Sequence, residues 1–248
     1  MSNILTIARS EMRRIFVSPL AWTVLAVVQL ILGFVFLRLL IEYSANPQIA
    51  MDSYTGVADY VGAGLYGFAT IILLLVMPLM TMRLFSEEKK SGSIDLLHSA
   101  PVSLTEVVLG KYLGLLGFML ALLFLAALMP MSLMFGTDLD LGRILAGLLG
   151  LLLLMLAFGA AGLFMSTLTR EPTIAAVGSF GLLLVVWLSQ ILAYQDIPFA
   201  EVFDYISLIG HYDSLRRGVF NSADVTYYLL FAGLFLWLAV QRLDMERN

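Results

Sequence analysis

The sequence predicts an all-α, polytopic membrane protein with six transmembrane helices. Three observations predict this class: six long uncharged stretches, 60% hydrophobic residues against 13% charged residues, and a mean hydropathy of +0.94. A helix of about 20 residues crosses the hydrocarbon core of a bilayer, and it satisfies its own backbone hydrogen bonds there. Residues 1–248 are expected to form a single transmembrane domain, with spans at about 20–41, 61–82, 112–135, 144–168, 173–194 and 225–241.

The distribution of basic residues predicts the topology of these spans. If the N-terminus is cytoplasmic, the inside segments hold ten Lys and Arg residues, and the outside segments hold four: Arg38, Arg143, Arg216 and Arg217. Cytoplasmic loops carry an excess of these residues. We therefore expect both termini in the cytoplasm. No cleavable signal peptide is evident, so the first span is expected to be retained.

Residues 2–18 are expected to form an amphipathic helix rather than a further span. Ser10, Arg13 and Arg14 lie off its apolar face, and arginines at such positions suit the headgroup layer, where they meet anionic lipid. The segment is either a flank that only sets the topology or an interfacial helix that braces the first span. Its apolar face is formed by Ile4, Leu5, Ala8, Met12, Ile15 and Phe16.

Several functional classes lack the residues that they need. The chain has no cysteine, and no HExxH, Gly-x-Ser-x-Gly or phosphate-loop motif occurs. His98 and His211 fall on opposite sides of the membrane in the expected topology, so they cannot share a metal. We therefore expect no catalytic residue, metal site or cofactor in this chain. Nucleic acid is not an expected partner, since no basic stripe with interleaved aromatic residues is present.

The spans also disfavour an ion-driven carrier. An ionisable side chain inside a membrane usually marks a proton or ion path, and carriers of this kind need such a group or broken helices at their centre. No span has an Asp, Glu, Lys, Arg or His at mid-depth. If the protein moves a cargo uphill, the energy is expected to come from another chain.

The most specific stretch is the cytoplasmic loop 83–111, RLFSEEKKSGSIDLLHSAPVSLTEVVLGK. Its polar beginning contains Glu87 and Glu88. Gly92 is expected to break the helix there, and Ser93 is expected to cap a new helix by accepting a bond from a free backbone N–H. The new helix would end before Pro101, because a residue that precedes proline avoids helical geometry. It would present a short apolar surface with one carboxylate among its members: Ile94, Asp95, Leu96 and Leu97.

A further helix is expected after this segment. Ser103 has the N-cap position, and Glu106 stands at the capping-box offset. From the residues alone, an ordinary loop that rests on the membrane is the alternative interpretation of 83–111, since amphipathic loop helices commonly lie there.

The loop resembles the pattern of the ABC-2 type permeases, the membrane subunits of one class of ATP-binding-cassette transporters. That pattern is EE-(K/R)-x-x-G-(T/S)-(L/I)-E-x-L-x-x-x-P-(V/I)-(S/T). Asp95 stands where the family more often has Glu, and Ser93 where it often has Thr; both changes keep the chemistry. The resemblance implies that this segment is a coupling helix docked into a groove on a separate ATPase subunit, which binds ATP and magnesium. The matching residues are Glu87, Glu88, Lys89, Gly92, Ser93, Ile94, Asp95, Leu97, Pro101, Val102 and Ser103.

The outer loop 196–224 is similar to the outer segment of the same family, particularly of the gliding-motility-associated subgroup. This likeness rests on Ser207, His211, Gly218, Val219, Asp224 and Tyr227. His211 is expected to be a hydrogen-bonded loop histidine rather than a metal ligand. The helical spacing of four apolar residues predicts a short helix that dips into the outer leaflet: Phe199, Val202, Phe203 and Ile206. A cap that closes the outer end of the pathway is the favoured interpretation of this helix, and ligand binding is the alternative.

Two functions follow from the resemblance as expectations. In the first, the chain is a non-catalytic permease subunit surrounded by the membrane lipid of a bacterial cytoplasmic (inner) membrane. It pairs with a second permease chain, identical or related, and the pair binds two ATPase chains. In the second, it is a mechanical or scaffold subunit, and ATP hydrolysis moves a large extracytoplasmic partner protein instead of a solute. The likeness to the gliding-motility subgroup and the absence of a polar centre motivate the second function.

Overall fold

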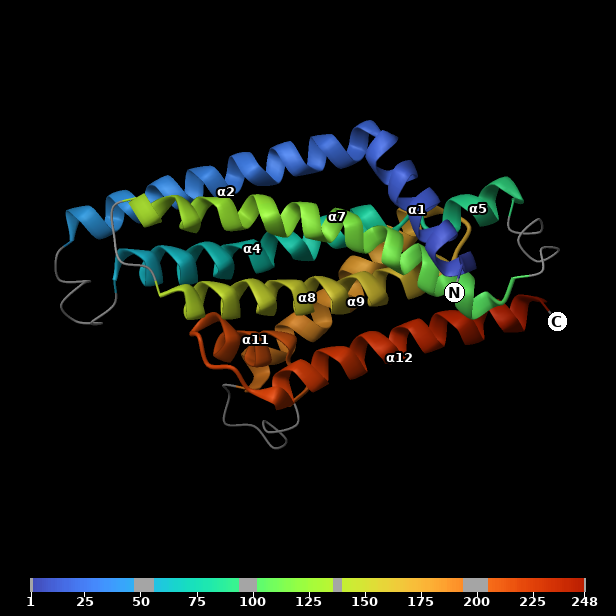
Figure 1. Cartoon of the computed structure of the whole chain (residues 1–248). Coiled ribbons are helices and arrows are strands. Elements are labelled where there is room, and N and C mark those ends of the chain that lie inside the picture. Colours follow the sequence, from blue (N-terminus) through green and yellow to red (C-terminus); the bar gives the residue numbers. More distant parts are fainter. Residues whose placement is uncertain (1, 47–55, 94–101, 136–139, 194–204, 248) are drawn as a thin grey trace.

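The computed structural model describes residues 2–46, 56–93, 102–135, 140–193 and 205–247, and these residues are helical nearly throughout (Figure 1). The predicted all-α class is confirmed, and six of the described helices are long and apolar enough to cross a membrane. In chain order the elements are α1 (Ser2–Val17), α2 (Pro19–Ala45), α4 (Val57–Thr81), α5 (Ser86–Ser91), α7 (Leu104–Ser132), the 3-10 helix η1 (Leu133–Phe135), α8 (Leu141–Leu168), α9 (Pro172–Ala193), α11 (Leu208–Arg216) and α12 (Ser222–Arg247).

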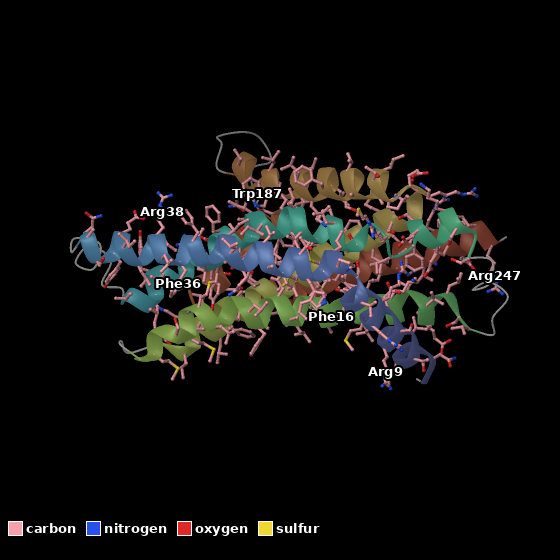
Figure 2. All side chains as sticks on the ribbon, turned by 90° about the horizontal axis from the view of Figure 1, so that it is seen from above. Arg9, Phe16, Phe36, Arg38, Trp187 and Arg247 are labelled. Atoms are coloured by element: carbon pink, nitrogen blue, oxygen red, sulfur yellow. The ribbon has the colours of Figure 1, made fainter. Side chains whose placement is uncertain are left out.

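The long helices run side by side and give the bundle two distinct ends. Helices α1 and α5 and both ends of the chain lie at one end, which we call the terminal end (Figure 1). Helix α11 lies toward the opposite end, which we call the distal end. Arg9 and Arg247 lie at the terminal end and Arg38 lies toward the distal end, so these charges flank an apolar middle (Figure 2).

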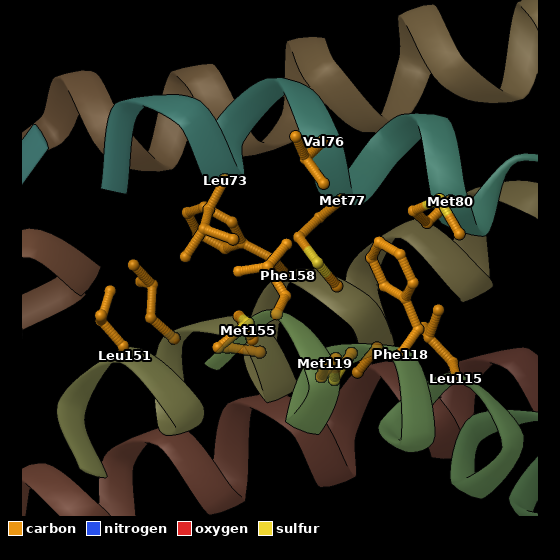
Figure 3. Packing of buried hydrophobic residues seen from close by; sticks show 14 of the residues in the cluster. Leu73, Val76, Met77, Met80, Leu115, Phe118, Met119, Leu151, Met155 and Phe158 are labelled. Atoms are coloured by element: carbon orange, nitrogen blue, oxygen red, sulfur yellow. The ribbon is translucent and has the colours of Figure 1, made fainter. Parts of the chain in front are cut away.

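Helix α8 forms the centre of the bundle. Buried residues make up 67% of its apolar window, against 17% in α2. Two glycines permit this central position, because a Cβ at Gly159 would lie 2.3 Å from Met119 Cε and one at Gly162 would lie 2.2 Å from Thr81 Oγ1. Small residues let helices approach closely in a membrane. The core between α4, α7 and α8 is filled by residues such as Phe158 (Figure 3).

Helix α2 shows why a span at the edge is long and yet little buried. Ser18 caps it by accepting a hydrogen bond from the Leu20 amide at 3.3 Å, and Pro19 stands at its first turn. Leu30 and Phe34 are 74% and 68% exposed, which suits lipid or a second chain. A single stripe with helical spacing packs inward: Ala21, Leu25, Val28, Leu32 and Val35.

Helix α1 packs along α7, and this contact changes the interpretation of both segments. A Cβ at Gly110 would lie 2.7 Å from Ile7 Cβ, and one at Gly114 would lie 2.7 Å from Glu11 Cβ. The buried side of α1 therefore includes a carboxylate, Glu11, that the predicted apolar face leaves out. Leu5, a member of that predicted face, is 66% exposed.

Helix α7 begins eight residues before the predicted third span. Its start carries the predicted capping box: the Ser103 hydroxyl accepts from the Glu106 amide at 3.2 Å, and the Ser103 amide donates to the Glu106 carboxylate at 3.0 Å. The predicted cap and the predicted span therefore belong to one continuous helix. The polar loop ends at Ser103 rather than at residue 111, because one helix satisfies the backbone of both segments.

Candidate functional site

The short helix α5 is held at the terminal end by a serine of the central helix. The Ser166 hydroxyl accepts hydrogen bonds from the amides of Phe85 and Ser86 at 3.0 and 3.1 Å, and it donates to the carbonyl of Met82 at 3.0 Å. Amides and carbonyls at helix ends lack partners within the helix. One buried side chain of α8 therefore fixes the corner between α4 and α5.

Gly92 ends α5, as its position in the sequence predicts. Its φ of +72° lies in the left-handed region, where glycine is favoured at a helix C-terminus. Ser93 follows, and its hydroxyl lies 2.9 Å from the Ser91 hydroxyl. The helix that Ser93 is expected to cap lies outside the described residues, as do Ile94, Asp95, Leu96, Leu97 and Pro101.

Five charged residues from α1, α5 and α7 form what we call the α5 ion cluster. At its centre the Lys111 ammonium lies 2.5 Å from Glu88 and 3.3 Å from Glu11. Arg14 lies 3.2 Å from Glu88 and 2.9 Å from Glu87. The Lys111 side chain is 3% exposed, so its charge depends on these carboxylates, since a buried ion needs a partner. The cluster ties α1 and α7 to α5.

A second ion pair connects α5 to the C-terminal helix. Lys89, whose side chain is 5% exposed, pairs with Glu246 of α12 and donates to the Thr167 carbonyl of α8. Lys90 instead points to the surface, where it lies 2.8 Å from Glu171 and both side chains are more than half exposed. The neighbouring lysines of the motif therefore make one buried contact and one exposed contact.

The residues of the predicted motif therefore have two structural roles. Glu88 and Lys89 face the bundle and anchor α5, and Gly92 ends the helix. Sequence reasoning missed Glu11, Lys111 and Glu246, which complete these contacts. The sequence does contain one signal for Lys111, which is a charged residue directly before a long apolar run. Such a charge is costly near the membrane without a partner, so an ion pair could have been expected there.

The residues of the predicted outer motif lie at the distal end, and they also come together. His211 lies in α11 and not in a loop, and its Nδ1 is 2.7 Å from Asp224 at the start of α12. Ser207 caps α11 by accepting from the Gly210 amide at 3.1 Å. Gly218 has a φ of +84° and lies against Arg143, which comes from α8. The motif therefore fastens the segment before α12 to the bundle.

The hydrogen-bond geometry of His211 suits this fastening role. Its two ring nitrogens contact Asp224 and the Tyr205 carbonyl, and the ring stacks on Tyr227 at 4.2 Å between centroids. Within the described part of the chain, no group of three or more His, Cys, Asp or Glu residues could hold a metal. Burial raises the pKa of Tyr212 in the same helix, so its hydroxyl stays protonated and donates to the Tyr66 carbonyl at 3.2 Å.

The chain was compared with known protein families and with curated proteins. Residues 2–220 match the model of a family described as ABC-2 type transporter. Among curated proteins nothing matches the chain. The matched region runs from α1 through α11 and ends before α12, so it includes Lys89 and not its partner Glu246.

Proposed function

Because the chain belongs to the ABC-2 type transporter family as a multi-pass, membrane-embedded permease subunit of a family without an ATPase domain, we propose that it couples ATP hydrolysis on a partner ATPase subunit to transport across a bacterial inner membrane. Family membership implies such a partner. In this arrangement the terminal end lies in the cytoplasm, and the excess of basic residues at that end supports this orientation.

The observation that carries the coupling proposal is the anchorage of α5. Residues 94–101 connect α5 to α7, so a force applied to this segment acts on both helices. Ser166, Lys89 and the α5 ion cluster fasten α5 to the central helix, to α12 and to α1. Breaking a buried ion pair by removing one partner costs about 3–5 kcal/mol. Movement of α5 is therefore expected to carry the attached helices with it.

In this mechanism the residues of the motif have separate tasks. Glu87, Glu88 and Gly92 shape and anchor α5 from within the permease. Ser93 and residues 94–101, which include Asp95 and Leu96, are proposed to contact the ATPase subunit. Binding and hydrolysis of ATP would displace this contact and rock the spans between two arrangements. A second permease chain, identical or related, would complete the pathway.

The test uses the permease purified together with its ATPase subunit. Replacement of Asp95 and Leu96 by lysine should abolish the ATP hydrolysis that the permease stimulates, because the docking surface would lose its apolar and acidic character. Membrane insertion should remain intact. The control replaces Val219 and Phe220, which are 59% and 63% exposed at the distal end, by lysine. Unchanged complex formation and turnover in the Asp95 and Leu96 variant would refute the docking surface.

A mechanical function is the second candidate, and the packed core favours it. Met77, Met119 and Phe158 fill the space between α4, α7 and α8 and are fully buried, so a single chain offers no polar path there (Figure 3). ATP-driven motion would then act through the distal segment on an extracytoplasmic partner, as the likeness to the gliding-motility subgroup suggests. Co-purification of such a partner would support this function. ATP-dependent movement of a defined compound in reconstituted vesicles would rule it out.

A further inference from the structure

A cavity of about 530 Å³ lies at the distal end, where α4 and α8 meet the segment that joins α11 to α12. We call it the distal cavity. Leu39 and Ile144 give it apolar walls, and Gly62 leaves room along α4. None of these residues contributes to the contacts that anchor α5. The cavity is therefore separate from the proposed coupling site.

Three arginines line the distal cavity, and they differ in how many of their N–H donors are already engaged. Arg216 binds Asp213 through two nitrogens and donates its third to the Ala63 carbonyl at 3.2 Å. It fits because Gly67 has no side chain: a Cβ there would lie 2.8 Å from Arg216 Nη1. With its nitrogens engaged, Arg216 fastens α11 to α4.

Arg143 and Arg217 keep donors for another partner. Arg143 Nη1 lies 2.8 Å from Asp59, and its Nε is 3.8 Å from Asp140. Arg217 Nη2 lies 2.6 Å from Asp213. A guanidinium has five N–H donors. The side chains are 45% and 71% exposed, so the remaining donors are accessible.

This combination of groups fits one chemical class of ligand. Guanidinium groups bind phosphates and carboxylates through paired hydrogen bonds, whereas Leu39 and Ile144 offer an apolar surface beside them. Tyr66 adds a further polar group, since it lines the cavity, is 2% exposed, and its hydroxyl has no hydrogen-bond partner in the described part of the chain. Buried tyrosine hydroxyls usually find a partner.

We propose that the distal cavity binds an amphiphile with an anionic headgroup. The headgroup lies on Arg143 and Arg217, and the apolar chain lies along Leu39 and Ile144. Binding at this site does not depend on a partner ATPase. A failed binding test would therefore leave the coupling proposal unaffected, and the reverse also holds.

The sharpest test fills the cavity without removing a charge. Gly62 lines the cavity and a Cβ there meets nothing within 4 Å, so the side chain of Gly62→Leu starts in open space beside the cavity. Leucine also suits a helix better than glycine. Gly233→Leu in α12 is the matched control, because its Cβ also meets nothing within 4 Å and it does not line the cavity. Helix content measured by circular dichroism verifies that both variants fold.

Binding is measured by native mass spectrometry of the purified chain titrated with phosphatidylglycerol, phosphatidylcholine or glycerol phosphate. We expect preferential retention of phosphatidylglycerol, an affinity loss of about tenfold in Gly62→Leu and in the double variant Arg143→Gln with Arg217→Gln, and wild-type affinity in Gly233→Leu. Equal retention of the two lipids, or unchanged affinity in Gly62→Leu, would overturn the proposal. Equal binding of glycerol phosphate would overturn the apolar part of the site.

Discussion

At the scale of single residues, Lys111 shows how this chain keeps a charge inside a packed helix pair. The residue lies about two turns after the start of α7, where α1 packs along that helix, and its side chain is 3% exposed. Glu11 and Glu88 supply its carboxylates, and the Phe85 ring lies 5.2 Å from its ammonium group. The charge is therefore tolerated because two other segments, far away in the sequence, complete its surroundings.

Removal of this ammonium group should destabilise the protein strongly. In Lys111→Met, the buried Glu11 and the partly buried Glu88 would lose their buried cation and keep Arg14, which is 40% exposed. Removal of one partner from a buried ion pair costs about 3–5 kcal/mol. We expect a clear fall in the midpoint of thermal unfolding in detergent, partly restored when Glu11→Gln and Glu88→Gln are added. Lys90→Met removes an exposed pair worth about 0–1 kcal/mol and serves as the control. Equal midpoints for the two single variants would contradict this account.

At the scale of elements, α5 is a helix of six residues that depends on its neighbours. Isolated helices shorter than about 12–15 residues are marginal in water. Ser166 binds its first amides, and Lys89 connects it to α12 through Glu246. Because the family match ends before α12, the contact with Glu246 extends the anchorage beyond the matched region.

The contact between α5 and α12 should affect the rate of ATP hydrolysis that the permease stimulates. We expect Lys89→Met and Glu246→Gln each to lower permease-stimulated ATP hydrolysis several-fold, and the double variant to lose little more than either single one, because both changes break the same contact. The measurement is the hydrolysis rate of the purified complex at matched permease content. Lys90→Met is the control, since the ion pair of Lys90 is with the exposed Glu171, which precedes α9. Additive losses would show that the two residues act independently.

The same elements show what the sequence could and could not predict. The six spans follow from length and apolarity, and the Ser103 cap and the Gly92 helix end follow from local chemistry, because each depends on neighbours in the chain. The burial of Glu11 could not be predicted in this way. Its partner, Lys111, is a hundred residues away, and no periodicity within residues 2–18 contains that information. The continuity of α7 could not be predicted either, because the charge of Lys111 indicates the end of a polar loop and its buried partners lie in other segments.

At the scale of the whole molecule, polar contacts gather at the two ends of an apolar bundle. The α5 ion cluster lies at the terminal end, and the arginines of the distal cavity lie at the other. The middle of α8 is packed with residues such as Ala157 and Phe158 that carry no charge. This division suits a membrane, since ions are stable in the headgroup layers and costly in the hydrocarbon core.

The division also leads to a prediction of orientation, with the terminal end in the cytoplasm because most Lys and Arg residues lie there. The chain contains no cysteine, so single cysteines can report sidedness without interference. In spheroplasts, a membrane-impermeant maleimide should label Phe220→Cys, which is 63% exposed at the distal end, at once. It should label Arg247→Cys only after the membrane is permeabilised. Labelling of Arg247→Cys in intact spheroplasts would reverse the orientation, and an ATPase in the cytoplasm could then not reach α5.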